Sequence, residues 1–212
     1  MAQNNGQASG AELPSEAIHR FWFGPLDKAG APAPRYRKRW FSGGVAFDAE
    51  IRERFGTWVE RALAGELDPA RGEVRAELAL VLLLDQFTRN CFRGEARAFA
   101  GDARALEVVR AAIDAGRDQS LLPVERSFFY LPFEHSEDLA DQDRAVQLFE
   151  TLRAAAPEAL HELLDGSLSY AIKHREIIRR FGRFPYRNQS LCRTDTAQER
   201  AWLADGGPRF GQ

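Results

Sequence analysis

The feature that most constrains the fold of this chain is a run of apolar residues that ends abruptly in polar ones. Residues Leu78 to Leu84 are all apolar, and Asp85, Gln86, Arg89 and Asn90 follow directly. Seven residues are far too few to cross a bilayer, which takes about 20. A helix that is apolar on every side predicts instead a central element that its neighbours bury.

The polar end of this predicted helix needs partners, because buried polar groups without hydrogen bonds are costly. Spacing by four residues places Asp85, Arg89 and Arg93 in one stripe along the helix. Gln86 and Asn90 form the neighbouring stripe. We therefore expect other parts of the chain to bring complementary groups to this point.

The rest of the chain is patterned for helices. No stretch alternates polar and apolar residues in the manner of a strand. Apolar residues instead recur at helical spacing, with start and stop signals at the ends. Five expected helices cover about residues 46–64, 73–91, 96–115, 124–131 and 158–181. Three more are expected to begin near residues 15, 136 and 196. We predict an all-α fold of about eight helices in antiparallel pairs, forming one domain over residues 13–212 after a disordered tail over 1–12.

Composition excludes several classes of protein. The 212 residues suit one domain, and 29 basic against 31 acidic residues leave a formal net charge of −2. That balance favours neither nucleic acid nor an anionic membrane as a partner. The two cysteines, Cys91 and Cys192, match no disulfide or zinc pattern. The first ten residues lack an apolar signal core, so we expect a cytoplasmic protein.

One candidate site is the segment from Glu134 to Asp138. A histidine beside carboxylates suits general acid–base chemistry, with His135 as the base or acid and Glu134 or Asp138 orienting it. The alternative is a helix start, in which Ser136 caps the helix while Glu137 and Asp138 interact favourably with the positive end of its dipole. Capping explains little about Glu134 and His135, and we therefore favour a functional role for those two.

A second candidate is the loop from Gly182 to Asn188, which carries Arg183 and Arg187 and is followed by Arg193. Arginines around a short, proline-stiffened loop suit bidentate binding of a carboxylate or phosphate. The loop also echoes the central helix, since both segments end in arginine and asparagine shortly after an aromatic residue. The candidate ligand-binding residues are Asp85, Gln86, Arg89, Asn90, Arg183, Arg187, Asn188 and His174.

A purely structural network is the alternative for these charged residues. Four carboxylates would neutralise four arginines, so that no ligand is needed. Against it, buried ion pairs rarely improve stability over apolar packing. The carboxylates would be Asp85, Glu134, Glu137 and Asp138, and the arginines Arg89, Arg93, Arg183 and Arg187.

His174 lies on an apolar stripe, where a histidine is more often a core residue than a ligand. Its spacing would nonetheless let it face the same cavity. His135, Asp138, His174 and Asp85 are adequate metal ligands by type, but no spacing fixes a ligand set, so we assign no metal and leave the cofactor open. The chain has no glycine-rich phosphate loop and no nucleophile elbow.

Four segments together resemble the bacterial family catalogued as domain of unknown function 924. They are Phe21 to Gly24, Leu84 to Asn90, Leu131 to Asp138 and Phe181 to Asn188. The resemblance covers about residues 15–205 and implies a helical fold similar to tetratricopeptide-repeat superhelices. It implies no activity. One departure is Cys192, where the resemblance leads us to expect glycine.

Two functional hypotheses follow. In the first, the protein is an enzyme that acts on a small anionic substrate, with Arg89, Arg183 and Arg187 binding the anion. In the second, it is a non-catalytic, repeat-like module that binds a peptide or partner protein. An enclosed cavity of a few hundred Å³ favours the first, and an open groove favours the second. We expect no nucleic-acid or membrane partner, and the sequence does not indicate an oligomeric state.

Overall fold

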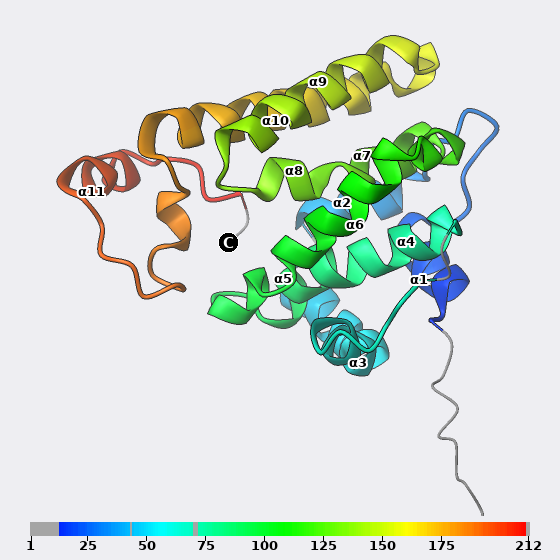
Figure 1. The fold of residues 1–212 in the computed structure, drawn as a ribbon, viewed down its shortest axis with the longest axis horizontal. Coiled ribbons are helices and arrows are strands. Elements are labelled where there is room, and N and C mark those ends of the chain that lie inside the picture. The colour runs from blue at the N-terminus through cyan, green and yellow to red at the C-terminus, as the bar shows by residue number, and fades with distance from the viewer. Residues whose placement is uncertain (1–12, 43, 70–71, 211–212) are drawn as a thin grey trace, which may run out of the picture.

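The computed structural model describes residues 13–42, 44–69 and 72–210, and the described chain is helical without strands, as predicted (Figure 1). The tail predicted over residues 1–12 lies outside the described residues. The α-helices are α1 (Ser15–Phe23), α2 (Pro34–Ser42), α3 (Gly44–Leu63), α4 (Val74–Val81), α5 (Thr88–Cys91), α6 (Asp102–Asp114), α7 (Pro123–Phe129), α8 (Leu131–His135), α9 (Leu139–Ala155), α10 (His161–Phe181) and α11 (Ala197–Ala204).

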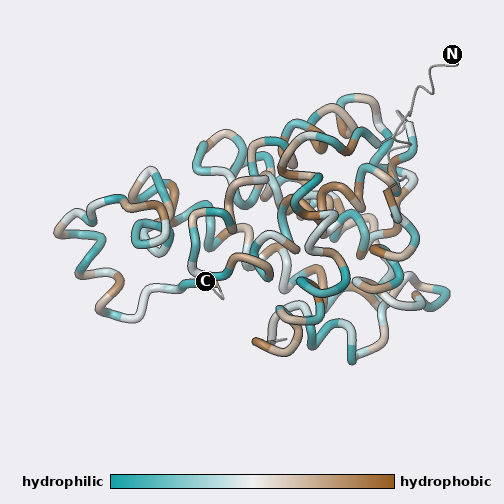
Figure 2. Tube along the Cα trace, turned by 90° about the horizontal axis from the view of Figure 1, so that it is seen from below, coloured by the Kyte–Doolittle hydropathy of each residue, from teal (hydrophilic) through white to brown (hydrophobic). Residues whose placement is uncertain are grey.

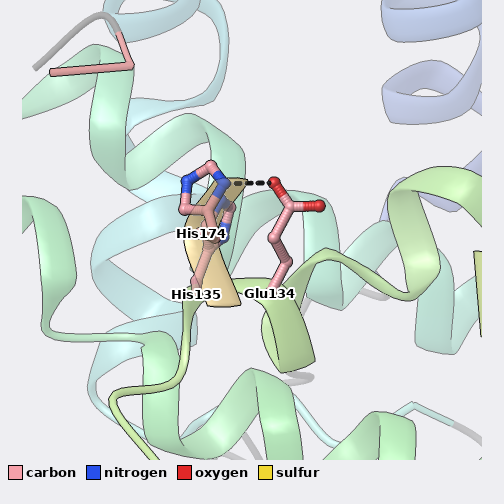
Figure 3. Close-up of side chains that lie close together, drawn as sticks. All are labelled: Glu134, His135 and His174. Carbon is pink, nitrogen blue, oxygen red and sulfur yellow. Dashed lines mark ion pairs between the residues drawn. The ribbon is translucent and has the colours of Figure 1, made fainter. Parts of the chain in front are cut away.

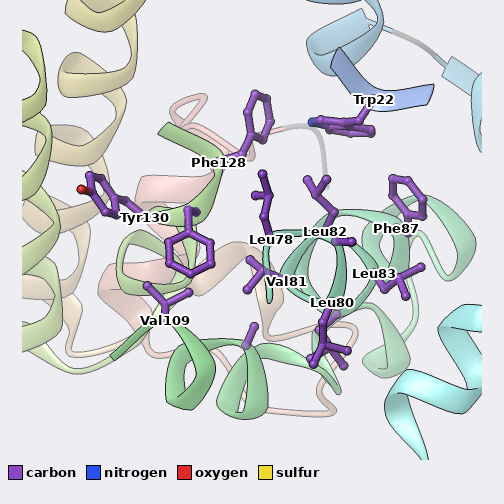
Figure 4. Packing of buried hydrophobic residues seen from close by; sticks show 14 of the residues in the cluster. Trp22, Leu78, Leu80, Val81, Leu82, Leu83, Phe87, Val109, Phe128 and Tyr130 are labelled. Atoms are coloured by element: carbon purple, nitrogen blue, oxygen red, sulfur yellow. The ribbon is translucent and has the colours of Figure 1, made fainter. Parts of the chain in front are cut away.

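The central helix is buried as its sequence predicts. Leu78 and all of Leu80 to Leu84 have no solvent exposure, and apolar side chains from several other helices surround them (Figure 4). The helix is not uniform, however, because a π-helical turn, η1 (Leu82–Phe87), separates α4 from α5. The Thr88 hydroxyl donates to the carbonyl oxygen of Leu84 across this wider turn, at 2.8 Å. Such π-turns often mark functional sites.

The helix predicted over residues 96–115 is divided in two by a close backbone contact. A short 3-10 turn, η2 (Ala96–Phe99), ends just before Gly101, and α6 begins at Asp102. A Cβ atom on Gly101 would overlap the carbonyl oxygen of Leu84 in the π-turn. Glycine therefore permits this approach, which places the start of α6 against the polar end of the central helix.

The segment around residue 136 differs from the prediction in its cap. Ser136 does not cap the following helix; Asp138 does, accepting hydrogen bonds from the backbone of Ala140 at 2.8 Å and Asp141 at 3.3 Å. The reason is that the separate helix α8 reaches His135, and Pro132, expected to end a helix, lies in its first turn. Helix α11 begins near residue 196 as predicted, and Thr196 and Glu199 form a capping box there.

Helices α9 and α10 lie along one another on one side of the molecule (Figure 1). The turn η4 (Glu158–Leu160) precedes α10, which runs unbroken through Gly166. After α10, the 3-10 turn η5 (Pro185–Arg187) and α11 form a C-terminal part with a small core of its own, which includes Ile177, Phe184 and Tyr186.

Hydrophobic residues concentrate in the larger helical body, whereas the projecting C-terminal part is mainly hydrophilic (Figure 2). Among the described residues, none of the helices is long and apolar enough to span a membrane. The superhelical arrangement of tetratricopeptide repeats, which the resemblance implies, stays a prediction.

Candidate functional site

One cavity of about 740 Å³ lies where the central helix, α8, α10 and the loop after α10 come together. Its volume is within the range of small-molecule sites. The wall includes seven of the residues selected from the sequence: Gln86, Arg89, Asn90, Glu134, His135, His174 and Arg187. The three polar clusters of the sequence therefore converge in the folded chain.

His135 is held by a carboxylate of the central helix. Asp85 lies in the π-turn with no solvent exposure, and its Oδ1 atom is 2.6 Å from Nδ1 of His135. The Gln86 side chain donates to the other oxygen of Asp85, and Arg89 lies 3.4 Å from Oδ1. The sequence predicted Glu134 or Asp138 for this orienting role, and the structure has Asp85 in their place.

The electrostatics of this pair favour a charged aspartate and a neutral histidine. Burial alone would raise the pKa of Asp85, but the charge of Arg89 and the contact with His135 outweigh it and lower that pKa. Burial lowers the pKa of His135, and the opposing effect of Asp85 does not restore it. With Nδ1–H donating to Asp85, the neutral ring has Nε2 as its unprotonated nitrogen.

Two arginines of the cavity share one carboxylate that the sequence analysis missed. Arg89 donates to both oxygens of Asp102, at 2.8 and 3.0 Å, and to the backbone oxygen of Asp85 at 2.6 Å. Arg187 reaches the same Asp102 at 3.4 Å. The guanidinium of Arg187 lies over the rings of Phe99 and Phe184, and its Nε atom is buried without a hydrogen-bond partner in the described part of the chain.

Glu134 and His174 form a second buried pair on the cavity wall (Figure 3). Nδ1 of His174 lies 3.0 Å from Oε1 of Glu134 and 2.9 Å from the carbonyl oxygen of Tyr170. The other carboxylate oxygen of Glu134, Oε2, is buried and has no hydrogen-bond partner among the residues described. His174 is thus not an apolar core residue but part of the polar wall.

Three of the predicted site residues have other tasks. Asp138 caps α9 and lies outside the cavity wall. Arg183 pairs with both carboxylate oxygens of Glu199, at 2.6 and 2.8 Å, and donates to Thr194. Asn188 binds Asp195 and Arg193 within the C-terminal part. None of these three contributes directly to the cavity.

The balanced network of four carboxylates and four arginines is also paired differently from the prediction. Arg93 binds Asp48 of α3, at 2.8 and 2.9 Å, and Asn90 donates to the same carboxylate at 2.8 Å. Glu137 binds Arg193 rather than Arg183 or Arg187. Asp48, Asp102 and Glu199 are thus carboxylates that the predicted network left out, because the sequence does not show which distant arginine each of them meets.

The fold and the cavity define a class: an all-helical protein with a histidine held by a buried aspartate and with arginines around one polar cavity. Residues 18–207 match the family described as bacterial protein of unknown function (DUF924), and the chain belongs to that family. It is also similar to the solved structure of a protein of unknown function from Agrobacterium tumefaciens. The two are 41% identical with a TM-score of 0.74, over 91% of this chain and 97% of the other. No curated protein matches the chain.

Proposed function

We propose that the protein is an enzyme that acts on a small molecule bearing a carboxylate or phosphate group. The observation that carries the proposal is the Asp85–His135 hydrogen bond of 2.6 Å at the wall of a cavity lined by arginines. A histidine held through Nδ1 by a buried carboxylate is the usual arrangement of a general base.

In this proposal His135 takes the proton of a substrate hydroxyl or of a water molecule on its Nε2 atom. Asp85 keeps the ring in the required tautomer and stabilises the imidazolium that forms. Acid–base assistance of this kind typically contributes a factor of about 10² to 10⁴ in rate. Asp138, which caps α9, has no part in it.

Arg187 is the residue we propose for binding the anion, together with Arg89. The Nε–H of Arg187 is buried without a partner among the described residues, and its bond to Asp102 is long at 3.4 Å. A carboxylate or phosphate in the cavity would satisfy that donor with the fork geometry that arginine offers. Arg183, which pairs with Glu199, is left out of the anion site.

The competing hypothesis is a module that binds a peptide or partner protein. The cavity volume of about 740 Å³ falls within the usual range for small ligands. The side chains that we propose for catalysis in this cavity are also largely buried. Such a site suits a small molecule better than an extended peptide. The size and burial therefore support the enzyme hypothesis.

The proposal is tested first by anion binding. Inorganic phosphate and acetate are titrated separately into chelator-treated protein. At least one of these two anions should raise the melting temperature. The variant Arg187→Gln should lose that response. Arg179→Gln is the matched control, because Arg179 lies on the exposed face of α10, outside the cavity wall, and pairs with Glu176. An equal response in Arg187→Gln, or none in the wild type, contradicts the proposed anion site.

The catalytic part is tested with a panel of small phosphate and carboxylate esters, followed by proton NMR. His135→Gln should slow any turnover by a factor of about 10² to 10⁴, with a melting temperature close to that of the wild type. His161→Gln serves as the control, because His161 lies outside the cavity wall. Undiminished turnover in His135→Gln contradicts the role of this histidine.

A further inference from the structure

We infer that the cavity binds one divalent transition-metal ion through Glu134, His135 and His174. One donor atom from each of the three lies within 4.8 Å of the others. Two imidazoles and one carboxylate are the ligand set of many zinc and iron(II) sites, which leave further positions open. The inference goes beyond the proposed function, which needs no metal. The sequence did not reveal the set, because α8 and α10 supply its members from distant positions (Figure 3).

The unsatisfied oxygen of Glu134 points to a cation independently of the clustering. Glu134 is only 3% exposed, and its Oε2 atom has no hydrogen-bond partner within the described chain. A buried carboxylate oxygen without a partner destabilises the folded state, because it has lost its hydrogen bonds to water. A metal ion bound by this carboxylate would give the group a charged partner, and its Oε1 atom is the oxygen that faces His174 (Figure 3).

Both histidines are oriented as metal ligands usually are. Nδ1 of His135 faces the carboxylate of Asp85, and Nδ1 of His174 lies 2.9 Å from the carbonyl oxygen of Tyr170 and 3.0 Å from Oε1 of Glu134. A metal-binding histidine typically donates its second N–H to such an acceptor, which fixes the tautomer and leaves Nε2 with its lone pair. The two ring centroids are 6.0 Å apart, so the rings flank one region of the cavity.

A bound ion would change what the cavity does. It would occupy the Nε2 atom of His135, so that this atom could not accept a proton in the same molecule. The open positions of the ion would face a cavity that Arg89 and Arg187 also line. His135 can therefore act as a base in the metal-free protein but not in the metal-loaded protein. The two forms of the protein are measured separately.

The test is a titration of chelator-treated protein with Co²⁺, followed by visible absorption, and with Zn²⁺, followed by calorimetry. The expected result is one ion per chain. Glu134→Gln and His174→Gln should each weaken binding more than tenfold, and Asp85→Asn, which removes the charged support of His135, by about 10–100-fold. His161→Gln should bind as the wild type does. A stoichiometry of zero, or unchanged binding in both ligand variants, overturns the inference.

A second measurement uses only the wild-type chain, in case a variant does not fold. The protein has four histidines, and their ring nitrogens are observed separately by ¹⁵N NMR. Zn²⁺ should shift the signals of His135 and His174 and leave those of His19 and His161 unchanged. Shifts confined to His19 or His161 overturn the inference. The anion titrations use metal-free protein, so failure of the metal site and failure of the proposed function are seen independently.

Discussion

At the scale of single residues, Arg89 connects two carboxylates at the polar end of the central helix, because it donates to both oxygens of Asp102 and lies 3.4 Å from Oδ1 of Asp85. Helical spacing grouped Asp85 with Arg89; in the structure Arg89 lines the cavity, and Asp85 is fully buried behind it in contact with His135. The partner of Arg89, Asp102, was missed because it looks like an ordinary acidic residue in the first turn of a helix. Helical periodicity reports which face of a helix is buried, but it does not report which distant carboxylate an arginine meets.

Cys192 is a residue whose backbone conformation gives a prediction of stability. Its φ angle is +53°, in the left-handed region where a side chain costs roughly 1–2 kcal/mol. This strain gives a physical reason for the glycine that the family resemblance led us to expect. Cys192→Gly should therefore increase the free energy of unfolding by about 1 kcal/mol.

Urea denaturation of the two proteins measures this difference. Cys192→Ala is the matched control, because it removes the thiol and keeps the Cβ atom that causes the strain. A gain in stability for Cys192→Ala equal to that of Cys192→Gly would show that the thiol, and not the backbone, is responsible.

At the scale of elements, the π-turn and the glycine packed against it position the site. The apolar run predicted a buried helix correctly, but a π-turn depends on long-range packing and leaves no periodic signal in the sequence. Likewise, Gly101 lies within an apparently continuous helical pattern. The contact of Gly101 with Leu84 shows why the pattern is interrupted there.

Replacing Gly101 with alanine should destabilise the fold by about 1–3 kcal/mol, as overpacking of a tight contact usually does. The added methyl group would push the start of α6 away from Leu84, and with it Asp102.

The opposite result is expected for the control Gly166→Ala. Gly166 lies in α10 with no atom near its would-be Cβ, so alanine should stabilise the helix by about 0.5–1 kcal/mol. Chemical denaturation of both variants checks the pair; a Gly101→Ala protein as stable as the wild type would refute the packing argument.

The attachment of α11 should depend on pH through Glu199. The hydrogen bonds from Arg183 lower the pKa of Glu199 from 4.5 to about 2. A lowered pKa in the folded state means that this contribution is complete above about pH 4.5 and is lost as the pH falls towards 2. The melting temperature of wild type minus that of Glu199→Gln should therefore shrink between pH 6 and pH 3. A difference that stays constant over this range would show that the ion pair does not support the fold.

At the scale of the whole molecule, the all-α architecture followed from the sequence because apolar spacing and stop signals are local properties. The convergence of the three polar clusters followed from a cost argument, since a buried helix with charged residues needs partners. The pairing within the cavity did not follow, because four arginines and many carboxylates allow numerous combinations. Burial and backbone geometry choose among them only in the folded chain.

One atom, Nε2 of His135, is common to both proposals, because the proposed catalysis and the inferred metal site each need its lone pair. The most direct measurement is the ¹⁵N NMR spectrum of the histidine rings in metal-free protein at pH 7.5, with His135 assigned by its absence in His135→Gln. We expect a neutral ring protonated on Nδ1, as the contact with Asp85 requires. A ring protonated on Nε2, or on both nitrogens, would contradict the account and favour a structural ion pair.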